Sequence, residues 1–147
     1  MDYILIQQQL ESLLDKNNDL ISNLSNASAL IKEMVDDISW VGFYLVRENH
    51  LILGPFQGKV ACTKIAMNKG VCGTAVATKI NQLVKDTHKF IGHIACDSGA
   101  NSEIVINLYK NNEVIAVLDV DSYSFSRFDD NDLINFEIMA NIIEKLF

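Results

Sequence analysis

The chain has 147 residues, 49% of them hydrophobic, and a formal net charge of −7 at pH 7. This length fits one domain with a core of its own, and the hydrophobic content excludes a disordered chain. The negative charge argues against nucleic acid as a ligand and against docking on an anionic membrane, because both need a basic surface. The acidic start Met1-Asp2-Tyr3 lacks the basic region of a signal peptide, and no run reaches the length of a membrane span. We therefore expect a cytoplasmic protein, in which thiols stay reduced.

Two amphipathic helices are predicted within residues 1–38. Apolar side chains recur at helical spacing on both sides of a polar break at Lys16-Asn17-Asn18. The first stripe comprises Ile6, Leu10, Leu13 and Leu14, and the second comprises Leu20, Leu24, Ala27, Ile31 and Met34. Both stripes are typical of helices that face a core or a second copy of the chain. Neither helix carries residues that suggest chemistry.

From residue 39 the pattern favours strands. The segment 39–46 (SWVGFYLV) is rich in aromatic and β-branched residues, and a short polar loop separates it from 51–56 (LILGPF), which predicts a hairpin. The segments 103–109 (EIVINLY) and 114–122 (VIAVLDVDS) predict a second hairpin, because Asn111-Asn112 between them tolerates turn geometry.

A long, glycine-dotted stretch, residues 54–102, separates the two hairpins and contains all three cysteines. Within it we predict a short helix over 70–78 and, less clearly, a strand over 81–84. Loops of this length in a compact domain are usually functional, so this stretch is where we expect the chemistry.

The last predicted element is a helix that begins at the acidic run 129–132 and carries an apolar stripe: Leu133, Phe136, Ala140, Ile143 and Phe147. The order of elements predicts an α+β fold with an α/β-like three-layer arrangement, in which terminal helices cover one face of a mostly antiparallel sheet. We expect one domain over 1–147, divided into N-terminal helices (1–38), a sheet with loops (39–128) and a C-terminal helix (129–147).

The three cysteines, Cys62, Cys72 and Cys96, fit neither a metal clip nor a disulfide scaffold. No C-x-x-C pair is present, and an odd number excludes complete pairing. They are therefore either inert buried thiols or thiols that exchange partners. Together with His88 and His93 they could bind a metal, but their spacing matches no zinc motif, so we expect none.

Cys96 lies in a local sequence that favours thiolate chemistry. The residues after it, Asp97-Ser98-Gly99, predict a tight turn rich in backbone N–H groups. Such a turn could stabilise a thiolate or hold a carboxylate.

Asp119 and Asp121 are the acids that local structure explains least well. They alternate with apolar residues in a strand whose two faces are both apolar, so they are expected to share one face of a buried strand. Ionised carboxylates there are costly unless a cation meets them or one stays protonated. Glu103, at the start of the neighbouring strand, is a natural third member of the group. The alternative is that both aspartates lie beyond the sheet edge and cap a turn.

Trp40 and Tyr44 share a strand face with Gly42 between them. The missing side chain would leave room for a small apolar group between two aromatic rings. These residues are also typical of a hydrophobic core, and the sequence alone favours that interpretation.

Taken together, these segments resemble the free methionine-(R)-sulfoxide reductases, which are built on a GAF domain. The matching blocks extend from about residue 40 to residue 132 and read SWVGFYLV, LILGPFQGKVACTKI, GVCGTA, KDTHKFIGHIACDS, SEIV, VIAVLDVDS and FSRFDDND. The combination is far more specific than a general GAF resemblance. The chain departs from the family pattern chiefly at positions where prolines are usual, and no departure affects a cysteine, an acid or the tryptophan.

The resemblance implies a single GAF domain with a loop-rich ligand pocket on the sheet face away from the terminal helices. It implies reduction of free L-methionine (R)-S-oxide to L-methionine. Glu103, Asp119 and Asp121 would take the polar roles, with one of these acids protonating the sulfoxide oxygen. Trp40 and Tyr44 would surround the S-methyl group.

The resemblance also implies a redox cycle with Cys96 as the nucleophile. Attack on the sulfoxide would leave Cys96 as a sulfenic acid, which Cys62 or Cys72 would convert into a disulfide. A thioredoxin-like dithiol would then reduce that disulfide. No metal, flavin or nicotinamide is required, and a homodimer is a family-level expectation.

Two other functions are compatible with a GAF fold. One is a small-ligand sensor without catalysis, since a fold does not determine function. The other is a peroxide-responsive redox switch that forms the same sulfenic acid without a sulfoxide substrate. Three cysteines at family-matching positions argue against the simple sensor.

Overall fold

The computed structural model describes residues 1–92 and 99–147. In chain order its elements are α1 (Tyr3–Leu13), α2 (Leu20–Met34), β1 (Trp40–Arg47), β2 (His50–Gln57), β3 (Lys64–Ala66), α3 (Gly70–Thr78), β4 (Gln82–Val84), the 3-10 helix η1 (Thr87–Lys89), β5 (Ser102–Lys110), β6 (Glu113–Ser122) and α4 (Asp130–Glu144). None of the helices in this described part is both long and apolar enough to cross a membrane.

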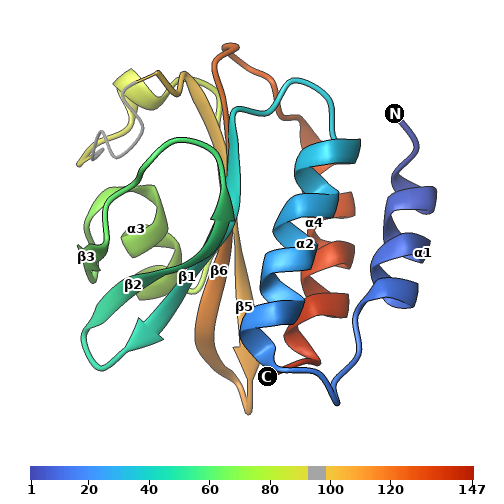
Figure 1. Cartoon of the computed structure of the whole chain (residues 1–147). Helices are drawn as coiled ribbons and strands as arrows, with labels where there is room; N and C mark the ends of the chain where they lie inside the picture. Colours follow the sequence, from blue (N-terminus) through green and yellow to red (C-terminus); the bar gives the residue numbers. More distant parts are fainter. Residues whose placement is uncertain (93–98) are drawn as a thin grey trace.

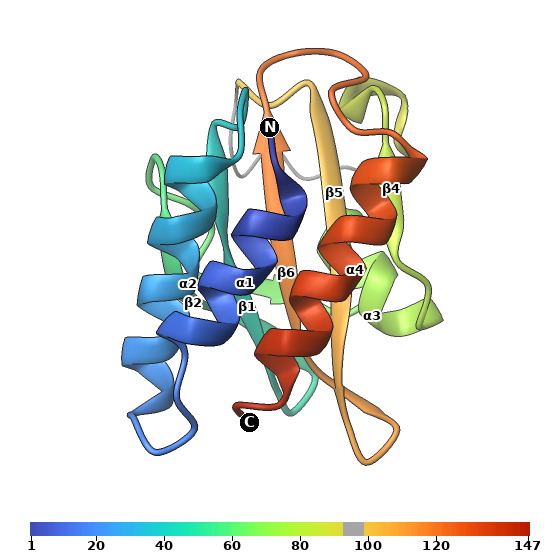
Figure 2. The ribbon, with the colours of Figure 1, turned by 90° about the vertical axis from the view of Figure 1, so that its right-hand side faces the viewer.

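The six strands form one sheet in the order β3-β2-β1-β6-β5-β4, and every neighbouring pair is antiparallel. Helices α2 and α4 cover the same face of this sheet (Figures 1 and 2). Helix α1 packs on both of them as an outer layer, while α3 lies on the opposite face. The predicted α+β architecture, with terminal helices on one face of an antiparallel sheet, is confirmed.

Alternation along the strands divides the apolar residues into two cores. Val41 and Phe43 of β1 point towards the helices and join a large core with the buried faces of α1, α2 and α4. Trp40 and Tyr44, on the other face of the same strand, belong to a second core beside α3. Because both faces are covered, β6 is buried on both sides from Ala116 to Ser122, as the apolar pattern of 114–122 predicted.

The predicted N-terminal stripe is right except at its end. Ile6 and Leu10 are completely buried, but Leu13 is 42% exposed. Helix α1 ends at Leu13, and its cap residue Leu14 turns to an extended backbone and packs partly against the core. Because the helix ends here, Leu13 does not make the contact with the core that helical spacing alone predicts.

Both predicted hairpins are present. The connection between β5 and β6 consists of Asn111 and Asn112, whose φ angles of 53° and 64° are both in the left-handed region. Two-residue hairpin turns need that backbone, and asparagine accepts it more readily than most residues. Helix α3 has the predicted bounds and β4 lies within the strand predicted over 81–84, whereas β3 and η1 were not predicted.

Helix α4 begins with a capping box, in which Asp129 accepts a hydrogen bond from the Asp132 N–H and the Asp132 side chain accepts one from the Asp129 N–H. The Asp132 carboxylate, which is buried, also accepts the Tyr3 hydroxyl and forms an ion pair with Arg127 at 3.3 Å. One carboxylate therefore joins α1, α4 and the segment before α4.

We expect Asp132→Ala to lower the free energy of unfolding by about 3 kcal/mol, because it leaves the buried Tyr3 hydroxyl without its acceptor and removes the carboxylate that pairs with Arg127. Urea titration followed by circular dichroism measures this loss. The matched control is Asp130→Ala in the same helical turn, where the side chain is exposed and a change below about 1 kcal/mol is expected. Equal losses in the two variants would contradict the role assigned to Asp132.

Candidate active site

Three acids meet on the sheet face that carries α3. In the β5–β6 register Glu103 lies directly opposite Asp121, and Asp119 is two residues before Asp121 on the same strand face. Residues directly opposite in an antiparallel pair project to the same side. Glu103, Asp119 and Asp121 are 7%, 5% and 7% exposed. Both aspartates lie within β6, so the alternative interpretation that they cap a turn beyond the sheet is wrong.

Strand β1 adds an aromatic side to this cluster. Trp40 is opposite Asp121 and Gly42 is opposite Asp119 on the other edge of β6. The rings of Trp40 and Tyr44 stack with centroids 6.0 Å apart, and the Trp40 indole N–H donates to the Lys59 carbonyl at 3.0 Å. These contacts hold the indole in one orientation next to the acids.

Phe56 of β2 is a member of this aromatic group that the sequence did not identify. Its ring stacks on Trp40 with centroids 5.2 Å apart. A Cβ placed on Gly42 would lie 2.3 Å from the Phe56 Cβ and 2.7 Å from the Trp40 ring. The space expected above Gly42 is therefore filled by Phe56 and Trp40, and glycine is needed there for their close approach. The signal that could have found Phe56 is the β1–β2 hairpin, which pairs it with Gly42.

Tyr44 connects the aromatic group to the loop that carries Cys62. Its hydroxyl donates to the Cys62 carbonyl at 2.9 Å. Burial, followed by the negative charge of Asp119, raises the pKa of Tyr44 well above its usual range. The phenol is therefore neutral at physiological pH and acts as a donor.

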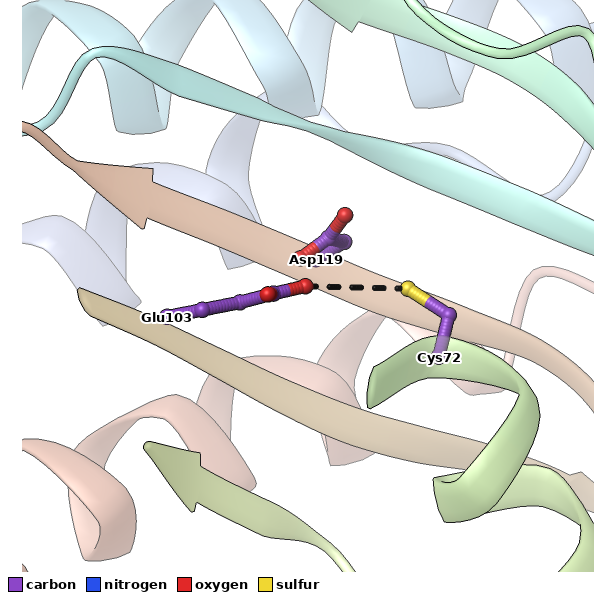
Figure 3. A group of neighbouring side chains, drawn as sticks. All are labelled: Cys72, Glu103 and Asp119. Atoms are coloured by element: carbon purple, nitrogen blue, oxygen red, sulfur yellow. Dashed lines mark hydrogen bonds between the residues drawn. The ribbon is translucent and has the colours of Figure 1, made fainter. Parts of the chain in front are cut away.

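Cys72 approaches the acids from the first turn of α3 (Figure 3). Its Sγ lies 4.0 Å from Glu103 Oε1, in a long S–H to carboxylate hydrogen bond, and the Asp119 carboxylate is a second acceptor within reach of the same thiol. Burial, followed by the charges of Asp119, Glu103 and Asp121, raises the pKa of the Cys72 thiol well above its usual range. Cys72 is a free cysteine. Because its pKa is raised, its side chain is an S–H donor at neutral pH rather than a thiolate.

The position of α3 depends on two close contacts. A Cβ on Gly73 would lie 2.8 Å from the Ala66 carbonyl oxygen, so glycine lets the helix sit directly against the end of β3. Asn107 of β5 donates its side-chain N–H to the Ala75 carbonyl at 2.9 Å. These contacts set the depth at which Cys72 reaches the acids.

The remaining predicted residues are placed as follows. Cys62 is partly buried and disulfide-bonded. His88 lies on η1, and its ring shares a hydrogen bond with Asn101 at 2.8 Å. The predicted nucleophile Cys96 and His93 fall within residues 93–98, outside the described residues.

Among the residues that the structure describes, one group could share a metal ion: Cys72, Glu103 and Asp119, whose donor atoms lie within 4.8 Å of one another. Neither His88 nor Cys62 belongs to this group, in contrast to the Cys–His site considered from the sequence. A structural zinc site normally closes with four ligands. We assign no metal to this group of three.

Comparison with known proteins shows the family of this chain. Residues 24–146 match the GAF domain family model. The chain is 44% identical over 144 residues to the free methionine-R-sulfoxide reductase of Escherichia coli strain K12, covering 98% of this chain and 87% of that protein. It is also 47% identical to the free methionine-R-sulfoxide reductase of Saccharomyces cerevisiae over 143 residues, covering 92% and 79% of the two chains.

A solved structure of Neisseria meningitidis free methionine-R-sulfoxide reductase, in complex with its substrate, superimposes with a TM-score of 0.95 at 41% identity. It is matched over 99% of this chain and 87% of that one. The chain therefore belongs to the free methionine-R-sulfoxide reductases, a family built on the GAF domain.

Proposed function

We propose that this protein reduces free L-methionine (R)-S-oxide to L-methionine. The observation that carries this proposal is the buried cluster of Glu103, Asp119 and Asp121 beside the Trp40 ring, in a chain of this family. The relative from Neisseria meningitidis, whose structure holds its substrate, supports the same assignment.

The chemistry of the substrate matches the two sides of the site. Free methionine sulfoxide carries an ammonium group, which needs an anionic partner that a buried carboxylate cluster supplies. Its S-methyl group needs an apolar wall, for which the rings of Trp40 and Tyr44 are suited. A methionine within a polypeptide has no free ammonium, so this cluster would favour the free amino acid.

The reaction begins with attack of the Cys96 thiolate on the sulfoxide sulfur. Glu103 or one of the aspartates protonates the sulfoxide oxygen. The sulfoxide oxygen is transferred from the substrate sulfur to the Cys96 sulfur, which becomes a sulfenic acid. The substrate then leaves as methionine. The substrate sulfur is thereby reduced by two electrons and Cys96 is oxidised by two.

Cys62 is the thiol that we assign to the second step. Its attack on the sulfenic acid releases water and forms a disulfide. The disulfide-bonded state of Cys62 and the free, protonated thiol of Cys72 support this choice over Cys72. A dithiol of the thioredoxin type would then reduce the disulfide, and the cycle needs no metal, flavin or nicotinamide.

We further propose that the protein works as a homodimer in the cytoplasm. Apolar side chains of the N-terminal helices that face solvent, such as Ile4 and Ile21, each 67% exposed, support an interface there. A reducing compartment suits an enzyme whose proposed cycle begins with a free thiol at Cys96.

Turnover of the two epimers of free methionine sulfoxide tests the proposed activity. The protein is incubated with each epimer and dithiothreitol, and methionine is quantified. We expect the R epimer to be consumed and the S epimer to remain. Consumption of neither epimer would favour a sensor, or a peroxide switch if hydrogen peroxide still oxidises the cysteines. Consumption of the S epimer would contradict the assignment.

A further inference from the structure

Cys72 occupies a different position from that expected of a thiol that exchanges disulfides. It is 5% exposed, lies on a helix rather than in a loop, and directs its Sγ towards Glu103 and Asp119 (Figure 3). The side chain of a resolving cysteine has to reach the sulfenic acid as a thiolate, and this one is held against carboxylates instead.

The groups that face Cys72 come from three strands. Glu103 lies on β5, Asp119 and Asp121 on β6, and Tyr44 on β1. The charges of the three acids act on the Cys72 thiol, and the neutral Tyr44 phenol is close enough to interact with it. Carboxylates accept hydrogen bonds and repel a negative charge nearby, so this surrounding favours a donor at the Cys72 position. An S–H group supplies one donor and no charge.

Two contacts hold α3, the helix that carries this donor, against the sheet. Gly73 lies against the carbonyl of Ala66, and Asn107 on β5 binds the carbonyl of Ala75 in α3. Asn107 and Glu103 belong to the same strand, so α3 and the strand that carries Glu103 are directly connected. A change in the orientation of Glu103 would therefore break a contact with a fixed partner.

We propose that Cys72 is a positioning residue, whose S–H group donates to Glu103 and holds this carboxyl in the orientation used towards the substrate, and that it is not a redox thiol. This inference rests on the proposed reductase function. In the proposed cycle only Cys96 and Cys62 change oxidation state, so a positioning role explains why a third cysteine is present.

Two substitutions at this position separate the positioning role from a redox role. Cys72→Ser keeps a donor and removes the redox chemistry, whereas Cys72→Ala removes both. With the R epimer we expect kcat/KM to fall roughly tenfold in Cys72→Ala, the size of one hydrogen bond to a charged acceptor, and less than about threefold in Cys72→Ser. The same pattern is expected with dithiothreitol and with thioredoxin as reductant.

Other patterns would overturn the proposal. If both variants keep the dithiothreitol rate and lose the thioredoxin rate, Cys72 is a resolving thiol. If Cys72→Ala matches the wild type throughout, no positioning contact is needed. The wild-type protein separates this question from the proposed function, because absence of turnover in the wild type would contradict the reductase assignment itself.

Val71→Ala is the matched control for packing. Val71 is buried in the same core, next to Cys72 on α3, and has no donor. We expect this variant to lower the melting temperature as much as Cys72→Ala does while leaving kcat/KM within about threefold. A tenfold loss of kcat/KM in Val71→Ala would show that any cavity under α3 has this effect, and would overturn the positioning role.

A direct measurement of thiol state completes the test. The reduced enzyme is mixed with the R epimer without reductant, denatured, alkylated and mapped by mass spectrometry. We expect Cys72 to carry the alkyl group and to be absent from the disulfide. A disulfide that contains Cys72 after this single turnover would overturn the proposal.

Discussion

Cys96→Ser is expected to abolish reduction of free methionine sulfoxide, even with excess dithiothreitol. A serine hydroxyl is not ionised near neutral pH. Unlike a cysteine sulfur, it cannot accept the sulfoxide oxygen to form a sulfenic acid. Loss of the nucleophile in an enzyme that uses covalent catalysis lowers the rate by roughly 10³-fold or more. Release of methionine from the R epimer, measured at saturating substrate, is the readout.

Cys62→Ser is the matched control for this prediction. It removes the assigned resolving thiol but leaves the nucleophile, so the first step remains and dithiothreitol can reduce the sulfenic acid directly. We expect this variant to retain turnover with dithiothreitol and to lose it with thioredoxin. A near-normal rate in Cys96→Ser would place the nucleophile elsewhere and contradict the proposed cycle.

Asp121→Asn is expected to give the largest effect on substrate binding. Asp121 lies between Glu103 and Trp40 in the sheet register, so its carboxylate stands where the acids and the aromatic wall meet. The amide is nearly the same size but carries no charge for the substrate ammonium. A lost charge-assisted hydrogen bond of about 1.5–3 kcal/mol corresponds to roughly a 10- to 100-fold fall in kcat/KM.

Steady-state kinetics with the R epimer measure this effect, and Asp130→Asn is the control. Asp130 lies exposed in the first turn of α4, so the same chemical change there is expected to leave both kcat and KM within about twofold. Unchanged kinetics in Asp121→Asn would remove this residue from the substrate site.

Much of the fold could be predicted from local sequence patterns. The helical spacing of Ile6 and Leu10, the alternation through 114–122 and the turn at Asn111-Asn112 each predicted an element that the structure contains. These signals are strong because they depend on a period or on a backbone conformation within one element. The end of α1 and the short β3 and η1 were not predicted, since their placement depends on contacts outside the element.

By itself, the sequence identified the family and predicted the set of acids and the aromatic pair. The motifs around Glu103, Asp119 and Trp40 are local, and alternation alone places Asp119 and Asp121 on one face. Only the tertiary structure decided which residues meet there. Strand order and register are long-range properties, so the placement of Asp121 between Glu103 and Trp40 follows from pairing of β6 with both β5 and β1.

The roles of Phe56 and Cys72 depend in the same way on contacts between distant elements. Phe56 fills the space above Gly42 because the β1–β2 register brings the two together. Cys72 reaches Glu103 because α3 packs against the end of β3 and against β5, at a depth that Gly73 and Asn107 set. No spacing along the chain encodes that approach, since it results from packing between segments far apart in sequence.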